Sequence, residues 1–478
     1  MSVEAEVGKW AMTSLPKSWC WATFDEAFDN YTDTQKKVPT KQYVEAGALP
    51  VVDQGQELVG GFTNDETMQS GAPLPAIVWG DHTRCVKYIT YAFAQGADGV
   101  KVLVPTSAMI PRFGYHALKA VNLPNKGYSR HFKFLKVTKF PLAPLNEQRR
   151  IVTKVDSLFA KTKRAHDELG HVPRLIERYK QAILAAAFRG DLTADWRDQN
   201  SDQWSDEDIE ELRRARAAYL ASRRGSRLAA LDKPIELIGR ADLPRITVQL
   251  SDVVDLQVGY AFKSAWYSAE GPRLVRGANV APGKMDWEDE KRLTPELVPE
   301  YVEYLLAAGD IVLAMDRPII SGGLKVAVLG PEDDGALLVQ RVARFRANNF
   351  ARQDFIWFLL NSPIFIDHAL EHATGSDLPH ISSNDIQTTA FELPSLAEQD
   401  EIISRLRAAF SWIDRIVHEH DGASRLIERL DQSILAKAFR GELVPQAPDD
   451  EPASVLLERI QFERAAQPKK ARKRKARS

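Results

Sequence analysis

The chain has 478 residues, 44% hydrophobic and 27% charged, an ordinary composition for a globular protein and enough for about two to four domains. Its formal net charge is −2, so binding of nucleic acid would have to rely on local clusters of lysine and arginine. Two isolated cysteines, Cys20 and Cys85, exclude a disulfide framework and a zinc cluster and favour a reducing, cytoplasmic setting. The sequence shows neither a signal-peptide pattern nor an apolar run long enough for a membrane span, so we expect no membrane partner.

The first 144 residues predict a compact domain of mixed α and β structure. Short β-like runs, such as 49–52, 76–79 and 100–104, are separated by glycine, proline and asparagine, which mark turns. Runs of this kind combined with a helical stretch are typical of an α+β domain.

Residues 145–200 predict the first of two related helical regions. Glu147 falls in its first turn, after a proline-containing stretch, where the helix dipole favours an anion. Gly190 stands where a C-cap glycine ends a helix. A weak apolar stripe with coiled-coil spacing runs along the first helix: Ile151, Val155, Phe159 and Thr162.

A charged, arginine-rich helical linker is expected over 201–240, followed by a second α+β domain over 241–394. This domain matches the first in length and in its short β-like runs, for example 310–314 and 325–329. Its clearest helical stretch is 354–360. The two domains share little sequence, so their similarity lies in the pattern of elements.

Residues 395–445 repeat the first helical region. At a constant offset of 251 residues and without a gap, the segments 145–192 and 396–443 are identical at about 21 of roughly 48 positions. Two copies of one surface can bind two copies of one partner. The alternative is that both copies are core helices of a duplicated fold, although the similarity concentrates in the helices while the domains diverge. The second copy carries the stronger apolar stripe: Ile402, Leu406, Phe410, Ile413 and Val417.

Residues 446–478 form a tail that ends in a basic run over 469–477. Such a run would contact DNA phosphates without sequence preference. A solvated terminus with no ligand is an equally good interpretation.

The two helical regions share a pair of motifs that resembles the conserved helices of the specificity subunits of type I restriction-modification systems. The resemblance covers nearly the whole chain, which reads domain, helix, domain, helix. It implies an α+β fold in which two α/β target-recognition domains are separated by two long conserved helices, packed as a pseudo-twofold antiparallel coiled coil. The motifs read Leu145-x-Glu147-Gln148-x-x-Ile151 with Ala187-Phe188-Arg189-Gly190-x-Leu192, and Leu396-x-Glu398-Gln399-x-x-Ile402 with Ala438-Phe439-Arg440-Gly441-x-Leu443.

The resemblance also implies a non-catalytic subunit that reads a bipartite, asymmetric target in double-stranded DNA, one half with each domain. Two methylation subunits and two restriction subunits would be its partners. S-adenosylmethionine, ATP and magnesium would be bound by those partners, and this chain would bind no cofactor of its own.

Base reading needs hydrogen-bond donors and acceptors that project into a groove, and arginine pairs bidentately with guanine. In the first domain a short basic loop follows the β-like run at 76–79, and a second basic cluster precedes the first helical region. A salt-bridged surface turn is the alternative for the loop. The candidate DNA-binding residues here are His82, Thr83, Arg84, Lys87, Lys101, Arg130, His131 and Lys133.

The second domain offers a more scattered set of candidates, each of which could equally be structural. They are Tyr260, Lys263, Arg276, Arg317, Lys325 and His380. Matching positions of the two helical copies provide candidate contacts with partner subunits: Phe188, Arg189, Phe439 and Arg440.

Two other classes of protein stay open. A standalone DNA methyltransferase with fused recognition domains would need a catalytic run with paired prolines, which the segment 361–365 lacks. The sequence also shows no phosphate-binding glycine loop and no zinc motif. A coiled-coil scaffold that binds no DNA is the other class, and a salt-dependent affinity for DNA would separate it from a specificity subunit.

Overall fold

The computed structural model of the chain describes residues 10, 14–97, 99–124, 129–200, 204–222, 235–237, 245–375 and 379–466. These residues belong to two compact units. Unit 1 combines the chain up to Gly170 with the chain from His420 onward, and unit 2 is the continuous stretch His171–Glu419. The basic run over 469–477 and most of the linker after Ser222 lie outside the described residues.

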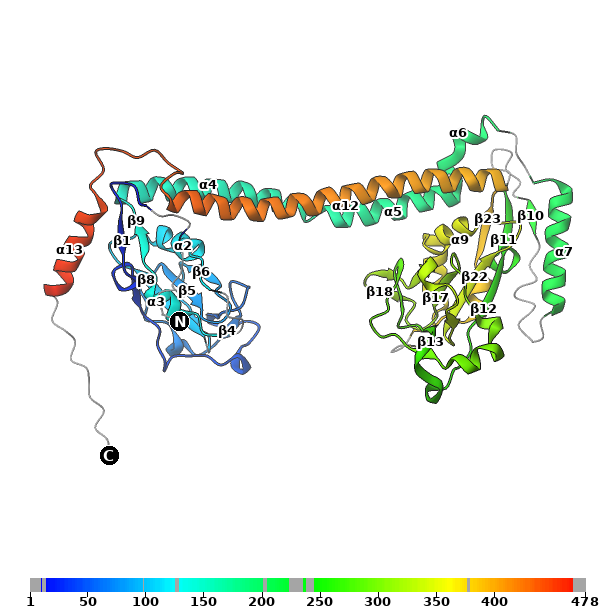
Figure 1. Cartoon of the computed structure of the whole chain (residues 1–478). Coiled ribbons are helices and arrows are strands. Elements are labelled where there is room, and N and C mark those ends of the chain that lie inside the picture. Colours follow the sequence, from blue (N-terminus) through cyan, green and yellow to red (C-terminus); the bar gives the residue numbers. More distant parts are fainter. Residues whose placement is uncertain are drawn as a thin grey trace. The chain divides into compact units, whose positions relative to one another are not determined.

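Unit 1 is built on a four-stranded antiparallel sheet in the order β2-β8-β5-β6 (Figure 1). The central strand β5 is buried along its whole length, which explains its unbroken apolar sequence. The strands of this sheet are β2 (Phe28–Asn30), β8 (Val100–Pro105), β5 (Ala76–Gly80) and β6 (Val86–Ile89). Further elements of the unit are β1 (Cys20–Ala22), α1 (Phe24–Ala27), β3 (Leu49–Val52), β4 (Gly61–Thr63), β7 (Ala94–Gln95), α2 (Pro111–Ala120), α3 (Phe132–Val137), β9 (Phe140–Leu142) and α13 (Ala453–Ala466).

Unit 2 repeats this plan with a central sheet in the order β12-β22-β17-β20. Its strands are β12 (Val254–Val258), β22 (Val342–Ala347), β17 (Ile311–Ala314) and β20 (Val326–Val328). The other strands are β10 (Glu236–Leu237), β11 (Ile246–Gln249), β13 (Tyr267–Val275), β14 (Val280–Ala281), β15 (Lys284–Met285), β16 (Arg292–Leu293), β18 (Ile319–Ile320), β19 (Gly323–Leu324), β21 (Leu337–Leu338) and β23 (Ala390–Leu393). The helices are α6 (Ala194–Arg197), α7 (Asp206–Ser222), α8 (Leu250–Val253), α9 (Gln353–Leu360), α10 (Pro363–His372) and α11 (Ser383–Gln387). The predicted α+β class is confirmed.

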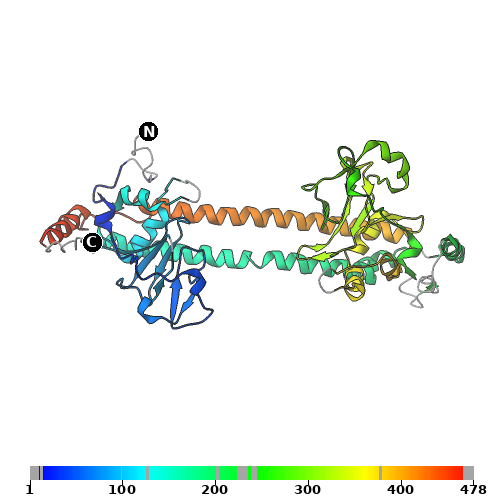
Figure 2. The same ribbon diagram turned by 90° about the horizontal axis from the view of Figure 1, so that it is seen from below.

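The repeated segments form the long helices of both units. The first copy is divided into α4 (Leu145–Leu169) and α5 (Val172–Arg189), whereas the second copy is the continuous helix α12 (Leu396–Phe439) (Figure 2). Gly190 and Gly441 follow the helix ends with left-handed φ angles of 89° and 71°, as expected for C-cap glycines. The predicted apolar stripe is confirmed in part: Ile151, Val155 and Ile402 are fully buried, whereas Val417 is 37% exposed.

Each unit contains one half of each copy. In unit 1, α4 packs against the last part of α12: Thr162 donates a hydrogen bond to Asp431, and a ring nitrogen of His420 lies 3.1 Å from the Leu169 carbonyl oxygen. Higher residue numbers in one helix therefore pair with lower numbers in the other. In unit 2 the first part of α12 packs against α5 in the same way, with the rings of Trp412 and Tyr179 5.7 Å apart. The predicted antiparallel packing of the helices is thus found within each unit.

The domains are fixed to these helices by a buried glutamine in each copy. Gln148 donates to the carbonyl oxygens of Ala108 and Ala143 and accepts from the amide of Ile110. Gln399 makes the same three bonds, to the carbonyl oxygens of Phe350 and Pro394 and from the amide of Arg352. The two units therefore orient their domains through one shared set of contacts.

Among the described residues, no helix is both long enough and apolar enough to cross a bilayer. Within the same residues, no group of three or more histidine, cysteine, aspartate or glutamate side chains could hold a metal ion.

Candidate nucleic-acid interface

In unit 1 the basic loop predicted from sequence is the turn between β5 and β6. It is closed by hydrogen bonds from the amide of Gly80 to the Cys85 carbonyl and from the amide of Arg84 to the Gly80 carbonyl, each 2.9 Å long. The Thr83 hydroxyl anchors it by donating to the Gln54 carbonyl at 2.6 Å. Arg84 has a left-handed φ of 61°, which is uncommon for a side chain other than glycine. The turn therefore presents an exposed arginine on a rigid end of the sheet.

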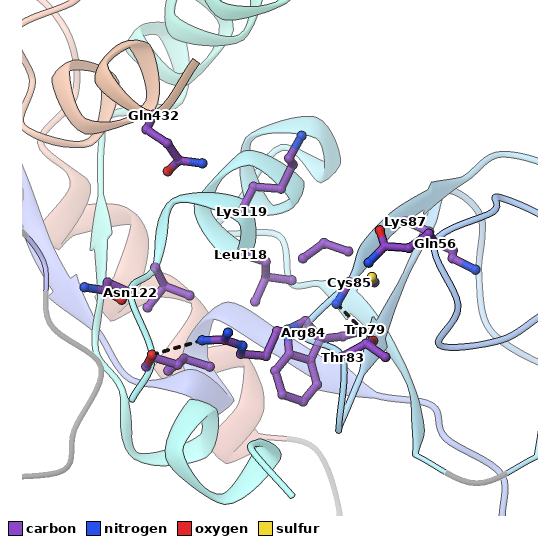
Figure 3. A pocket seen from close by; sticks show the side chains of 13 residues that line it. Gln56, Trp79, Thr83, Arg84, Cys85, Lys87, Leu118, Lys119, Asn122 and Gln432 are labelled. Carbon is purple, nitrogen blue, oxygen red and sulfur yellow. Dashed lines mark hydrogen bonds between the residues drawn. The ribbon is translucent and has the colours of Figure 1, made fainter. Parts of the chain in front are cut away.

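A pocket of about 510 Å³ opens beside this turn (Figure 3). Arg84 lies on one side and extends toward the Leu123 carbonyl, 3.4 Å from its guanidinium, while Lys119 of α2 and Gln432 of α12 line the other. Two cations and several amides in one concave surface suit a negatively charged or hydrogen-bonding ligand.

A second set of cations gathers near the first residues of β8. Lys101 and Lys136 both lie over the Phe132 ring, at 5.1 and 5.6 Å from its centroid. Burial lowers the pKa of Lys101, and the neighbouring charges of Arg130 and Lys136 lower it further while Asp81 opposes them. Cations that repel one another in this way gain from a shared anionic partner such as a phosphate. Sequence reasoning identified Lys101 and Arg130 but missed Lys136.

Two candidates of unit 1 are buried and bound to partners inside the domain. Lys87 is buried and forms an ion pair with Asp53, with the ammonium 3.3 Å from the carboxylate. His131 is completely buried, and its amide and ring both contact the Asp81 carbonyl oxygen. Both side chains satisfy internal polar groups, which sequence alone does not show. Lys133 is exposed, with its ammonium 4.8 Å from the Phe134 ring, and His82 is half-buried beside Gln54.

In unit 2 three of the predicted residues meet at the corresponding end of the central sheet. Arg317 follows β17 with a left-handed φ of 45° and donates its amide to the Pro379 carbonyl, which places it next to His380. A ring nitrogen of His380 lies 2.7 Å from the Asp316 carboxylate. Burial lowers the pKa of Lys325; Asp316 opposes this shift and Arg317 adds to it. Sequence reasoning missed Asp316, the carboxylate around which these cations gather.

The remaining candidates of unit 2 have other surroundings. Tyr260 belongs to an aromatic cluster with Phe262, Tyr301 and Tyr304, and Lys263 is exposed over the Trp266 ring. Arg276 is held by the carboxylate of Asp289, 2.8 Å away. These three do not join the cluster around Asp316.

The residues predicted to contact partner subunits divide into two kinds. Phe188 and Phe439 are 2% and 1% exposed and belong to the cores of units 2 and 1, so the prediction that they contact a partner is wrong. Arg189 is exposed and Arg440 is half-buried, and they form ion pairs with Asp191 and Glu442.

Exposed apolar residues occur instead at another pair of equivalent positions. Leu175 and Tyr179 of the first copy are 57% and 44% exposed, and Leu426 and Leu430 of the second copy are 62% and 49% exposed. Both pairs are separated by four residues, so each forms a patch on one helix face. Their signal in the sequence was an apolar residue repeated in both copies outside the coiled-coil stripe.

No protein-family model matches the chain. Among curated proteins, the EcoAI specificity subunit of Escherichia coli is 32% identical over 238 residues, which cover 48% of this chain and 39% of that protein. The EcoBI specificity subunit of Escherichia coli is 26% identical over 401 residues, 78% of this chain and 76% of that protein. The MjaVIII specificity subunit of Methanocaldococcus jannaschii is 32% identical over 198 residues, 41% of this chain and 45% of that protein. The chain thus spans less than half of two of these relatives.

Solved structures share the fold. A chain from a study of complex assembly and conformational transition in the type I R-M system matches 90% of this chain and 100% of its own length, with a TM-score of 0.60 and 17% identity. The HsdS subunit from Thermoanaerobacter tengcongensis matches 91% of this chain and 99% of its own, with a TM-score of 0.50 and 18% identity. These curated relatives are all named as specificity subunits. The chain is therefore similar in sequence to specificity subunits of type I restriction enzymes, and similar in fold to a chain of a type I R-M system.

Proposed function

We propose that this chain chooses the DNA target of a type I restriction-modification complex, with unit 1 reading one half of a bipartite site and unit 2 the other. The observation that carries the proposal is that both units place exposed, left-handed arginines, Arg84 and Arg317, at the same end of the same four-stranded sheet. Arginine is the side chain that most often reads guanine in the major groove. The two ends bear different residues, so the two half-sites would differ.

Base selection from a randomised duplex library tests the proposal. The wild-type chain should enrich two separated half-sites, with an affinity that falls as salt rises. Arg84→Ala should relax one half-site and Arg317→Ala the other, each by about 1–3 kcal/mol of discrimination. Arg149→Ala removes an exposed arginine of α4 and serves as the matched control. Loss at both half-sites from either single variant would contradict the proposal, and salt-independent or absent DNA binding would favour the scaffold class.

We further propose that the chain docks two methylation subunits, one on each of the equivalent apolar patches, Leu175 with Tyr179 and Leu426 with Leu430. Paired positions on a repeated helix offer the same surface twice, as two copies of one partner require. Two restriction subunits complete the proposed complex, in the cytoplasm. In it, S-adenosylmethionine, ATP and magnesium are held by the partner subunits rather than by this chain.

Counting subunits by native mass spectrometry tests the docking. The chain co-expressed with the methylation subunit of its own host should carry two copies of that subunit. Leu175→Asp with Tyr179→Asp should leave one copy, and so should Leu426→Asp with Leu430→Asp. Val302→Asp changes a side chain of similar exposure, 60%, away from the helices and should keep both copies. Two bound copies after either double substitution would place the docking surface elsewhere.

A further inference from the structure

The central sheets of the two units can be aligned residue by residue through their hydrogen bonds. Gly80 pairs with Val100 in unit 1, and Ala314 pairs with Val342 in unit 2. One residue further on, the Asp81 amide donates to the Gly99 carbonyl at 2.6 Å, and the Met315 amide donates to the Arg341 carbonyl at 2.8 Å. Gly99 and Arg341 therefore occupy the same position, directly before the second strand of each pair.

A third bond confirms this register. The His131 amide donates to the Asp81 carbonyl at 2.9 Å, and the Ile381 amide donates to the Met315 carbonyl at 3.0 Å. The residues that precede these two donors are Arg130 and His380, both of which are candidate DNA contacts. The position shared by Gly99 and Arg341 thus lies inside the candidate interface of each unit.

The backbone at this position is left-handed in both units, with φ of 77° at Gly99 and 72° at Arg341. Glycine adopts such angles without strain, whereas a residue with a β-carbon is disfavoured there. A β-carbon added to Gly99 would lie 2.6 Å from the Gln54 side-chain oxygen, so that side chain would also have to move. Unit 2 has an arginine at the position where unit 1 has glycine, the residue that adopts this φ angle without strain.

Stability of the fold does not account for this arginine. Its side chain is 53% exposed, and its guanidinium lies 3.5 Å from the Asp316 carboxylate and 3.3 Å from the nearer ring nitrogen of His380. Ion pairs between groups exposed to this degree contribute little to stability. Strained backbone that packing does not explain is concentrated at functional sites. Within the described residues, the non-glycine residues with positive φ are Arg84, Arg317 and Arg341, all at these sheet ends.

We propose that Arg341 is a specificity-determining residue of unit 2, whose guanidinium reads a guanine in the major groove. The inference rests on the proposed function, because it requires that this end of the sheet faces DNA. Asp316 holds the arginine on one side and would repel a phosphate there, so the edge of a base is the better partner. Guanine offers O6 and N7 as the two acceptors that a guanidinium contacts together.

Library selection on the full chain tests the assignment with Arg341→Gly and Arg341→Ala. Arg341→Gly restores the residue that unit 1 has and should leave the chain at least as resistant to heat as the wild type. Both variants should lose one guanine preference in one half-site, on the order of 10-fold, and keep every other preference. Arg352→Ala, which removes a 47% exposed arginine paired with Asp400, is the control and should change no base preference.

The results of this selection distinguish a failure of the Arg341 assignment from a failure of the proposed function. A wild-type chain that enriches no sequence would overturn the proposed function. A wild-type chain with two half-sites, both unchanged in Arg341→Gly and Arg341→Ala, would overturn the assignment of Arg341 alone. An equal loss at all positions in both variants would also overturn it, because a residue that contacts only phosphates weakens binding without changing base preference.

Discussion

The two units attach their domains to the repeated helices through the same positions but with opposite charges. In unit 1, Arg112 at the start of α2 forms an ion pair with Asp156 of α4. In unit 2 the corresponding pair joins Asp354 of α9 to Arg407 of α12, so the domain supplies the acid and the helix the base. The geometry is shared while the chemistry is reversed. A domain placed on the wrong helix would therefore face a like charge.

The buried glutamates of the two copies show the same contrast. Glu147 accepts from the Trp19 indole at 3.0 Å and from the Gln446 amide, which are neutral partners. Glu398 accepts from Arg245 and Arg197, each at 2.7 Å. Burial raises the pKa of Glu147; burial also acts on Glu398, but its two arginines outweigh it and lower the pKa. The carboxylate therefore occupies the same position in both copies, but the residues around it are neutral in unit 1 and positively charged in unit 2.

The largest predicted difference between the units follows from this contrast. Glu398→Gln removes the counter-charge of two nearly buried arginines and should cost unit 2 about 3–5 kcal/mol. Glu147→Gln should cost unit 1 less, about 1–3 kcal/mol, because no charge loses its partner there and one of the two donors, Trp19 or Gln446, loses its acceptor. Hydrogen exchange of the slowest peptides of each unit measures both effects. Equal losses in the two units would show that the arginines do not matter.

The pH dependence should also differ in sign. A lowered carboxyl pKa gives stability above the ordinary pKa that is lost as pH falls, so acid weakens unit 2 at Glu398. A raised pKa has the opposite effect, so stability at Glu147 decreases as pH rises through the acidic range. Each glutamine variant should flatten the corresponding part of its unit's profile.

Where the units agree, the substitutions should agree as well. Gln148→Leu and Gln399→Leu each leave two carbonyl groups and one amide without their partner, and we expect a cost of about 2–4 kcal/mol in either unit. The same exchange measurement checks this. A much smaller cost in one unit would show that its domain has a second attachment.

The two units also differ in one side chain at the contact between the domain and the long helix, where unit 1 has His116 of α2 against α4. The rings of His116 and Phe159 are 5.6 Å apart, and unit 2 has Phe358 and Phe410 at the same distance. Burial lowers the pKa of His116 to about 4. Since the folded form disfavours the proton, stability is complete above about pH 6.5 and falls below it, by about 2 kcal/mol near pH 5. His116→Phe, which copies unit 2, should remove this acid sensitivity from unit 1 and leave unit 2 unchanged.

The smallest expected effect concerns the reversed ion pair. Asp354→Arg places two arginines together and should cost about 1 kcal/mol or less, because both groups are largely exposed. Adding Arg407→Asp gives unit 2 the polarity of unit 1 and should recover the loss. A double-mutant cycle with no coupling would mean that the pair does not select the domain.

The helices could be predicted from the sequence because their information is local and repeated. The apolar stripe around Ile402, the C-cap glycines and the constant spacing of the copies all follow from the period of a helix. The base-reading candidates were found only in part. Lys87 and His131 were chosen as DNA contacts because the sequence does not show their partners inside the domain. These partners, Asp53 and the Asp81 carbonyl, are distant in the sequence. Arg341 could not be identified from the sequence, because its equivalence to Gly99 depends on the register of the strands in the two sheets.

The division of the chain into a continuous and a discontinuous unit has a consequence for its synthesis. Domains generally fold in order as the ribosome releases them. Unit 2 needs only His171–Glu419, so it can close before the last segment exists. Unit 1 combines a stretch that precedes unit 2 in the sequence with one that follows it, and contacts such as Arg150 with Asp450 join the two stretches. The contacts that cover the apolar face of α4 in unit 1 can therefore form only after all of unit 2 has been made.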